Sequence, residues 1–198
     1  MKPFTTLTSV VAPLSVDNVD TDTIIPSREM KSTGRTGLAD GLFAPWRYTH
    51  AAARTPNPDF VLNRPEYANA EILAAGCNFG CGSSREHAVW ALAEWGIRAI
   101  VAESFAPIFY QNCIRNGILP IVANNHALAH MAGAEVTIDL ARQVIVRGAT
   151  EIAFQIGEEA KTMLLEGLDA IDLTLKSRAD IDARTQRDRQ ARPWVYLS

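Results

Sequence analysis

The residues of this chain best suited to chemistry follow a glycine-rich run. Residues 80–87 read Gly-Cys-Gly-Ser-Ser-Arg-Glu-His. Two hydroxyl groups, those of Ser83 and Ser84, stand beside the guanidinium of Arg85, whose forked donors suit a carboxylate. We expect a helix to begin at Ser83 or Ser84, and the free backbone N–H groups at a helix N-terminus favour anions. The spacing therefore predicts an anion-binding turn that carries two hydroxyl groups.

A purely structural interpretation competes with this one. Ser83 and Glu86 fit the capping box S-x-x-E, which requires no catalysis. Capping does not account for the glycine run or for the adjacent Ser-Ser-Arg. His87 adds little, because a lone histidine is more often structural than a base or a ligand. The pattern alone leaves both interpretations open.

Two other functions could use the same run. A turn at Gly82–Ser84 could hold a phosphate or nucleotide in a non-enzymatic binding module, but no P-loop lysine follows it and the pattern G-x-G-x-x-G is incomplete. Cys77 and Cys81 could serve a thiol redox protein, but they do not form C-x-x-C. With Cys113 the chain has 3 cysteines, too few for a four-cysteine iron–sulfur site. We expect this chain to hold no metal by itself.

The elements that position the run alternate in type. Apolar segments at 71–75, 97–102 and 118–123 predict strands, and residues 107–116 and 125–132 predict helices. Together with a helix after the glycine run, this order is typical of an α/β core with parallel strands.

The flanking segments predict further strands. Residues 4–11 are rich in Thr and Val, as strands are, and lead into a polar turn that contains Asp22. Residues 136–146 alternate and predict a hairpin, and residues 152–156 predict one more strand.

The length of the chain predicts a single domain over residues 1–198. Residues 27–65 lack regular periodicity, which indicates a mobile, functional loop with short helical pieces. Residues at about 158–192 predict a C-terminal helical extension, amphipathic through Leu168, Ile171, Leu175 and Ile181.

Composition excludes several classes of partner. The net charge of −3 and the pI of about 5.8 argue against nucleic acid. No stretch approaches the ~20 apolar residues of a membrane span, and the N-terminus lacks the apolar core of a signal peptide. An odd number of cysteines predicts no disulfide framework, so we expect reduced thiols and a cytoplasmic location.

Several segments together resemble the small subunits of 3-isopropylmalate dehydratase, a family of the aconitase superfamily. The resemblance covers nearly the full chain and is most specific in GCNFGCGSSREHAVWAL. The matching segments are Asn18–Pro26, Arg35–Gly37, Leu42–Phe43, Trp46–Tyr48, Gly76–Leu92, Asn112–Pro120 and Leu164–Asp169.

The resemblance implies a fold, a partner and a cofactor. The fold would be the three-layer swivelling β/β/α domain of aconitase, with a partly parallel sheet. The enzyme would be a hydro-lyase that is active only with a large subunit. That subunit would hold a [4Fe–4S] cluster whose open iron polarises the substrate hydroxyl. The reaction would interconvert 2- and 3-isopropylmalate through 2-isopropylmaleate, in leucine biosynthesis.

The resemblance also implies roles for residues. Ser83 would be the base that removes the carbon-bound proton, as an alkoxide stabilised by Arg85 and neighbouring amides. Arg85 and Arg35 would bind substrate carboxylates. Ser84 would donate to substrate or cap the helix, and Asp22 would orient a catalytic group or close a turn.

We expect residues of the loop at 27–65 to determine which substrate the enzyme accepts. Leu38, Leu42 and Phe43 could contact an isopropyl group, although some of them must fold the loop itself. The loop departs from the family pattern around residues 39–41 and at Ala44–Pro45. A related hydro-lyase that acts on a citraconate/2-methylmalate or homoaconitate-type substrate is therefore the alternative.

Overall fold

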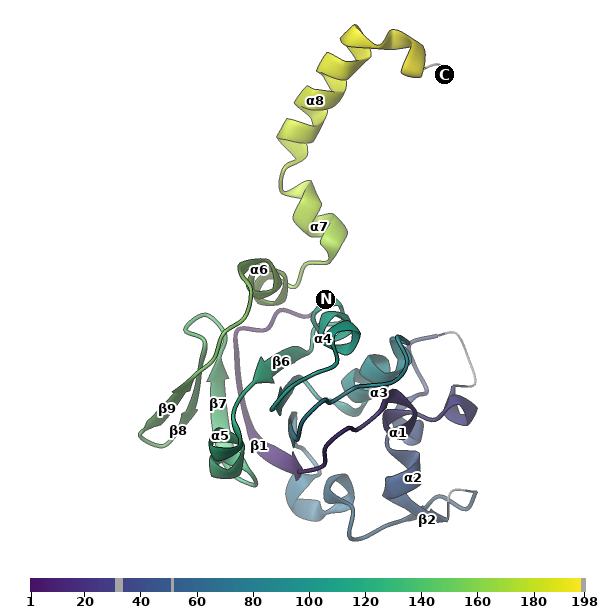
Figure 1. The fold of residues 1–198 in the computed structure, drawn as a ribbon, viewed down its shortest axis with the longest axis vertical. Coiled ribbons are helices and arrows are strands. Elements are labelled where there is room, and N and C mark those ends of the chain that lie inside the picture. Colours follow the sequence, from purple (N-terminus) through teal and green to yellow (C-terminus); the bar gives the residue numbers. More distant parts are fainter. Residues whose placement is uncertain (31–33, 51, 197–198) are drawn as a thin grey trace.

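Strand β1 (Thr6–Leu14) lies at the centre of the molecule and joins the two halves of one seven-stranded sheet (Figure 1). The structure is a computed structural model that describes residues 1–30, 34–50 and 52–196. The strand order is β6-β5-β4-β1-β7-β8-β9. The other strands are β4 (Ile72–Ala75), β5 (Ala99–Ala102), β6 (Leu119–Val122), β7 (Glu135–Asp139), β8 (Val144–Arg147) and β9 (Thr150–Ala153).

The half of the sheet that carries the glycine run is parallel. β1 pairs with β4, β4 with β5, and β5 with β6, all in parallel. The connecting helices are α3 (His87–Trp95) and α4 (Pro107–Arg115), and α5 (Asn125–Met131) follows β6. The predicted β-α-β-α-β core is therefore confirmed.

The parallel strands are buried on both faces. Leu73 and Ala75 of β4 belong to one apolar cluster, and Ile72 and Ala74 to the other. Because successive side chains of a strand point to opposite faces, a strand between two cores must be apolar throughout. This explains why these segments lack the alternation of a half-exposed strand.

Different helices cover the two faces. Val89 and Leu92 of α3 pack with Cys113 of α4 in the cluster of Leu73. Leu128 of α5 and Leu164 of α6 (Glu158–Glu166) pack on the opposite face. The molecule thus has the partly parallel, layered α/β architecture that the sequence predicts.

The other half of the sheet is antiparallel. β7 pairs with β1, and β8 and β9 follow in antiparallel order. The predicted hairpin at 136–146 is present as β7 and β8, and the strand predicted at 152–156 begins two residues earlier as β9.

The segment from 27 to 65 is more structured than a long loop. It contains α2 (Ala44–Arg47), a small β2–β3 ladder (Tyr48–His50 with Thr55–Pro56) and short 3-10 turns, and α1 (Thr21–Ile24) precedes it. Leu38, Leu42 and Phe43 are at most 1% exposed and belong to the core. The hypothesis that they contact a substrate substituent is therefore wrong, because they are used to fold the segment. The short 3-10 turns are Ser27–Glu29, Ala39–Gly41, Val61–Asn63 and Pro65–Tyr67.

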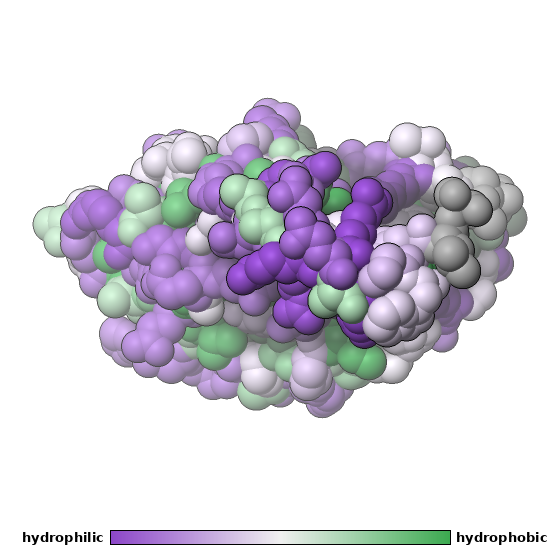
Figure 2. All heavy atoms as spheres, turned by 90° about the horizontal axis from the view of Figure 1, so that it is seen from above, coloured by the Kyte–Doolittle hydropathy of each residue, from purple (hydrophilic) through white to green (hydrophobic). Residues whose placement is uncertain are grey.

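The C-terminal helices project from the body as an arm (Figure 1). α7 (Ala170–Leu175), α8 (Arg178–Ala191) and a 3-10 turn (Pro193–Val195) contain no buried residue. Leu168 of the predicted apolar stripe is half-buried, but Ile171, Leu175 and Ile181 are 69%, 45% and 38% exposed. Seen along the arm, this face of the molecule is mostly hydrophilic (Figure 2). No helix in the described ranges is long and apolar enough to cross a membrane.

Candidate active site

Two segments far apart in sequence meet at the carboxyl ends of β1 and β4. The backbone N–H of Thr21 donates to the carbonyl of Cys81 at 2.8 Å, and that of Gly80 donates to Val19 at 2.8 Å. They meet because β1 and β4 are parallel neighbours, whose carboxyl ends lie at the same edge of the sheet. The glycine run is thereby placed against the polar turn that contains Asp22.

Gly80 allows the run to approach α4 closely. Its φ is +77°, and an added Cβ would lie 2.1 Å from the ring of Phe109. A side chain at this position would be both strained and blocked. The glycine therefore lets the Phe109 ring support the turn that leads to Ser83.

The helix expected at Ser83 or Ser84 begins later, at His87. That prediction is wrong, and Glu86 at the start of the helix makes no side-chain capping bond. Residues Ser83–Arg85 instead form an irregular turn, so Ser83 does not cap α3. The capping-box interpretation fails with it.

Arg85 contacts Ser83 directly. The Nε–H of Arg85 donates to the Ser83 hydroxyl oxygen at 2.9 Å, and the Arg85 backbone N–H approaches the same oxygen at 3.4 Å. Ser83 is half-buried and is not enclosed in the core. A positive charge therefore faces the oxygen that is the candidate base.

Asp22 and Ser27 hold the far side of the same guanidinium. Nη2 of Arg85 donates to the Asp22 carboxylate at 2.7 Å, and Nη1 donates to the Ser27 hydroxyl at 3.0 Å. The side chains of Arg85 and Asp22 are 37% and 62% exposed. An ion pair this exposed adds little stability, so its effect is to orient the fork. The structure thus brings together Ser83, Arg85 and Asp22.

Three residues that the sequence did not indicate also hold this turn. Thr21 accepts the backbone N–H of Ser83 at 3.0 Å through its hydroxyl oxygen. Asn112 of α4 is 4% exposed and donates from its side-chain amide to the carbonyl of Ser84 at 3.1 Å. Ser27 is the third. Thr21 and Asn112 lie inside matching segments, but no spacing rule distinguishes them.

The two remaining candidates lie apart from this network. The Ser84 hydroxyl is exposed and makes no hydrogen bond within the described chain. Arg35 is exposed, and its guanidinium carbon lies 5.2 Å from the ring centre of Trp90 on α3. Neither side chain contacts Ser83, Arg85 or Asp22 among the described contacts.

Helix α3 also holds the segment that follows Arg35. The Glu94 carboxylate accepts the backbone N–H groups of Gly37, Leu38 and Ala39 at 2.7, 2.6 and 2.9 Å. Desolvation alone would raise the pKa of Glu94, but the three donors together lower it below its usual range. This carboxylate is another functional candidate that the sequence pattern did not indicate.

Arg47 anchors the same segment from the other side. It is 2% exposed, donates to the carbonyls of Ala39 and Asp40 at 2.8 and 2.6 Å, and lies 4.6 Å from the ring centre of Trp95. The segment around residue 39 is thus fixed by a carboxylate on its N–H groups and a guanidinium on its carbonyls.

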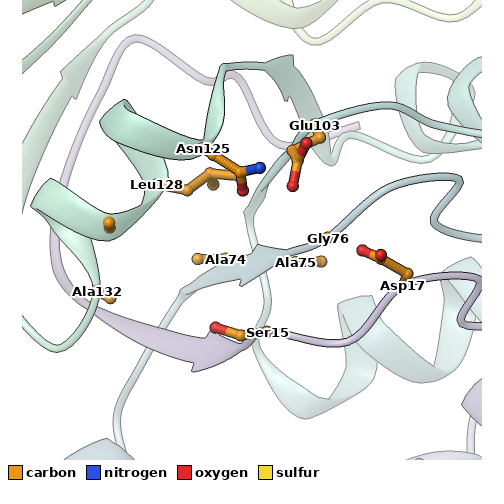
Figure 3. Close-up of a pocket in the computed structure, with 10 residues that line it drawn as sticks. Ser15, Asp17, Ala74, Ala75, Gly76, Glu103, Asn125, Leu128 and Ala132 are labelled. Atoms are coloured by element: carbon orange, nitrogen blue, oxygen red, sulfur yellow. The ribbon is translucent and has the colours of Figure 1, made fainter.

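A cavity of about 310 Å³ lies at the same edge of the sheet, but it does not contain the candidate site (Figure 3). Asp17, Glu103 and Asn125 face it from the ends of different elements, and neither Ser83 nor Arg85 lines it. Ser83 and Arg85 are half-buried at the surface, and Ser84 is exposed. Ser83 is the candidate because of the side chains that meet at it, and not because a cavity lies there.

Beside this cavity, one oxygen each of Asp17 and Glu103 and the sulfur of Cys77 lie within 4.8 Å of one another. The Cys77 thiol donates to Glu103 at 3.3 Å. This hydrogen bond, with partial desolvation and the charges of both acids, raises the pKa of Cys77. A thiol kept protonated is a poor nucleophile, which disfavours the redox hypothesis.

The three cysteines do not form a cluster site. Cys113 is 0% exposed, and its complete burial raises its thiol pKa. All three are free thiols, and no grouping of three cysteines occurs among the described residues. The chain's own thiols therefore do not fit an iron–sulfur cluster.

The nucleotide hypothesis loses its main support as well. It placed the phosphate at the Gly82–Ser84 turn, but the Ser83 amide of that turn already donates to Thr21, and the helix that follows begins only at His87. An anion at this turn would instead meet the Arg85 guanidinium.

Comparison with known proteins agrees with the fold. Residues 1–126 match the aconitase C-terminal domain family. The chain is 55% identical to the 3-isopropylmalate dehydratase small subunit of Cupriavidus necator, covering 100% of this chain and 99% of that protein. It is 50% identical to the 3-isopropylmalate dehydratase small subunit of Azorhizobium caulinodans, and the match covers 98% of this chain and 100% of that protein.

A solved structure is similar too. The crystal structure of 3-isopropylmalate dehydratase (leuD) from Methanocaldococcus jannaschii matches with a TM-score of 0.67 and 31% identity, covering 91% of this chain and 99% of that one. Fold and matches together define a swivelling domain of the aconitase type. More narrowly, the chain belongs to the family of 3-isopropylmalate dehydratase small subunits. The resemblance seen in the sequence is confirmed.

Proposed function

We propose that this chain is the small subunit of a hydro-lyase that interconverts 2- and 3-isopropylmalate through 2-isopropylmaleate, in leucine biosynthesis. Full-length identity of 48–55% to several small subunits of that name supports the assignment. The observation that carries the mechanism is the contact between Arg85 and the Ser83 oxygen at 2.9 Å.

Ser83 is the base for the carbon-bound proton. As an alkoxide, its oxygen takes the proton and becomes a hydroxyl, and the C–H electron pair moves into an anion conjugated with the adjacent carboxylate. A serine hydroxyl does not ionise unaided at neutral pH. The Arg85 guanidinium supplies a positive charge already aimed at the oxygen, and such preorganised donors lower the cost of the anion.

Asp22 and Ser27 keep Arg85 in that position. Their contacts occupy Nη2 and Nη1, and the fork still has N–H groups that can meet a substrate carboxylate. Asp22 is exposed and lies on the guanidinium side, so it orients Arg85 and does not touch Ser83. Arg35 provides the second carboxylate contact, and Ser84 offers its exposed hydroxyl to the substrate.

The partner is a large subunit that completes the site. Ser83, Arg85 and Asp22 lie on an open surface, which a second polypeptide can cover. The chain's cysteines do not fit a cluster, so we assign the [4Fe–4S] cluster to the large subunit. Three free thiols are compatible with the cytoplasm, where we place the enzyme.

The chain itself folds as one swivelling domain over residues 1–198 in this proposal. The segment at about 27–65 is its substrate element. The helical extension at about 158–192 has two parts, because α6 packs on the sheet while α7 and α8 do not.

The test uses the chain assembled with its large subunit under anaerobic conditions. Ser83→Ala should lower the turnover of 2-isopropylmalate about 1,000-fold or more, because the base is lost while binding groups remain. Ser177→Ala, at the exposed junction of α7 and α8, is the matched control and should retain wild-type turnover.

Wild-type turnover in Ser83→Ala, with assembly intact by gel filtration, would remove Ser83 from the mechanism. Assays with citraconate and homoaconitate separate the related substrates, and faster hydration of either than of 2-isopropylmaleate would favour the alternative hydro-lyase.

A further inference from the structure

One face of α3 holds the segment that carries Arg35. Trp90 and Glu94 are four residues apart, so they lie on the same side of the helix. The Arg35 guanidinium lies over the Trp90 ring, and Glu94 accepts three successive backbone N–H groups from Gly37 to Ala39. A side chain and the backbone just beyond it are thus held by one helix turn. We call Trp90 and Glu94 the α3 dock.

The Trp90 ring is itself fixed from behind. Its indole N–H donates to the side-chain oxygen of Asn116 at 3.0 Å, and the ring lies 4.7 Å from that of His87. Asn116 in turn donates to the carbonyl of Asn112 at 2.9 Å. An indole with its only donor satisfied and a ring packed beside it keeps one orientation.

The same network reaches the serine turn. Asn112 donates to the carbonyl of Ser84, and α3 itself begins two residues after Arg85. The positions of both arginines are therefore fixed relative to the same structural unit, which consists of α3 and the adjacent turn of α4. Arg85 is connected to α3 by the backbone that leads into the helix, and Arg35 is held by the α3 dock on the side of the helix.

We infer that the α3 dock is a positioning device that sets the distance between Arg35 and Arg85, and so matches the two arginines to the two carboxylates of one substrate. This rests on the proposed function, in which both arginines bind substrate. Trp90 and Glu94 act through Arg35 and do not touch the substrate.

Stacking suits this task chemically. A guanidinium that lies over an aromatic face keeps its in-plane N–H donors free, whereas a salt bridge would occupy them. Arg35 has no hydrogen-bond acceptor among the described residues, so its donors are available to a carboxylate. Glu94 binds backbone N–H groups and leaves the Arg35 guanidinium unpaired. The three backbone donors lower the pKa of Glu94 against the opposite effect of desolvation.

The experiment has two readouts on the same variants. Trypsin cleavage after Arg35, identified by mass spectrometry, reports docking in the chain alone. The KM and kcat of the assembled enzyme for 2-isopropylmalate report positioning. Glu94→Gln removes the carboxylate charge and replaces one of its two acceptor oxygens with an amide donor, so at least one of the three backbone N–H groups loses its acceptor. Cleavage should become about tenfold faster and KM about five- to tenfold higher, with kcat changed less than about twofold.

Two substitutions of Trp90 distinguish the effect of its aromatic face from the effect of its size. Trp90→Leu removes the aromatic face and should raise KM about threefold to fivefold. Trp90→Phe restores a face for Arg35 and should recover about half of that change or more. Glu151→Gln, which breaks an exposed pair with Arg142 on the far hairpin, is the matched control and should alter neither readout.

Each result decides a separate point. Unchanged cleavage after Arg35 in Glu94→Gln overturns the dock. Faster cleavage with unchanged KM, or an equal loss in kcat, overturns positioning of the substrate arginine. An inactive wild-type complex would contradict the proposed function instead, and trypsin cleavage would still decide whether the dock exists.

Discussion

The guanidinium of Arg85 turns back on the chain to donate from Nε to the hydroxyl oxygen of Ser83, two residues earlier. Its other two nitrogens are held by Asp22 and Ser27, which come from a segment about sixty residues away. One side chain therefore links the candidate base to the neighbouring strand end. This arrangement needs a planar fork with three donor directions, which only arginine offers.

Replacement of that fork tests its geometry. Arg85→Lys keeps the charge but cannot donate to Ser83, Asp22 and Ser27 together. The kcat/KM of the assembled enzyme should fall about 100-fold, the usual cost of losing one anion-stabilising donor. Arg142→Lys, in an exposed pair with Glu151, is the control and should retain activity. Activity within twofold of wild type in Arg85→Lys would show that charge alone suffices.

The exposed partner of Arg85 should matter for activity and little for stability. Asp22→Asn keeps the shape but removes the charge that orients the fork, so kcat/KM should fall about tenfold. Because the pair is largely exposed, the melting temperature should change by less than about 2 °C. Steady-state kinetics and thermal melting of the same sample check both points. A large loss of stability would mean that Asp22 has a structural role.

The thiol of Cys77 should become more reactive when Glu103 loses its charge. The hydrogen bond to Glu103 is the largest cause of the raised Cys77 pKa. A raised pKa means a smaller thiolate fraction at a given pH, so Glu103→Gln should lower the pKa and increase thiolate. Alkylation of Cys77 by iodoacetamide at pH 8 should be severalfold faster, as measured by mass spectrometry. Buried Cys113 should stay unmodified in both proteins and serves as the internal reference.

Close contact at Gly80 predicts a large loss of stability. Gly80→Ala forces a side chain into a left-handed backbone position and against the Phe109 ring. The free energy of unfolding should fall by about 2–4 kcal/mol, measured by urea denaturation. Gly148→Ala is the matched control, because its φ is +57° but no atom lies within 4 Å of the added Cβ. That variant should lose only about 1 kcal/mol. Equal losses in the two would assign the effect to backbone strain alone.

Removal of the outer part of the arm, beyond α7, should leave the body folded. A chain that ends at Leu175 loses α8, the 3-10 turn and the exposed pair between Lys176 and Glu166, but no buried residue among the described residues 176–196. Its melting temperature should stay within about 2 °C of the full chain, since exposed pairs contribute little. Circular dichroism would record the loss of helix. A marked drop in melting temperature would show that the arm packs on the body.

Much of the fold was predictable from local pattern. β4, β5 and β6 are short apolar runs followed by helices, and that order permits few alternatives to a parallel, doubly covered sheet. The hairpin of β7 and β8 was visible as alternation. The pairing of β7 with β1 was not, because antiparallel contact between distant strands leaves no local mark in either one.

The residue types of the candidate site could be read from the sequence, but their arrangement could not. Ser83, Ser84 and Arg85 were evident from the motif, and Arg35 and Asp22 from the resemblance. The motif also suggested a helix start at Ser83. That expectation failed because the Ser83 hydroxyl accepts from Arg85 and its amide donates to Thr21, so neither group caps a helix.

The sequence by itself determined the family, the apolar strands and the reactive residue types, because these depend on side-chain chemistry and short-range periodicity. Tertiary structure decided which groups meet. Parallel pairing of β1 with β4 brings Asp22 and Ser27 to Arg85, and Leu38, Leu42 and Phe43 are buried in the core. Hydrogen bonds and burial depend on which residues are close in space. Residues that are far apart in the sequence come close together only when the whole core packs.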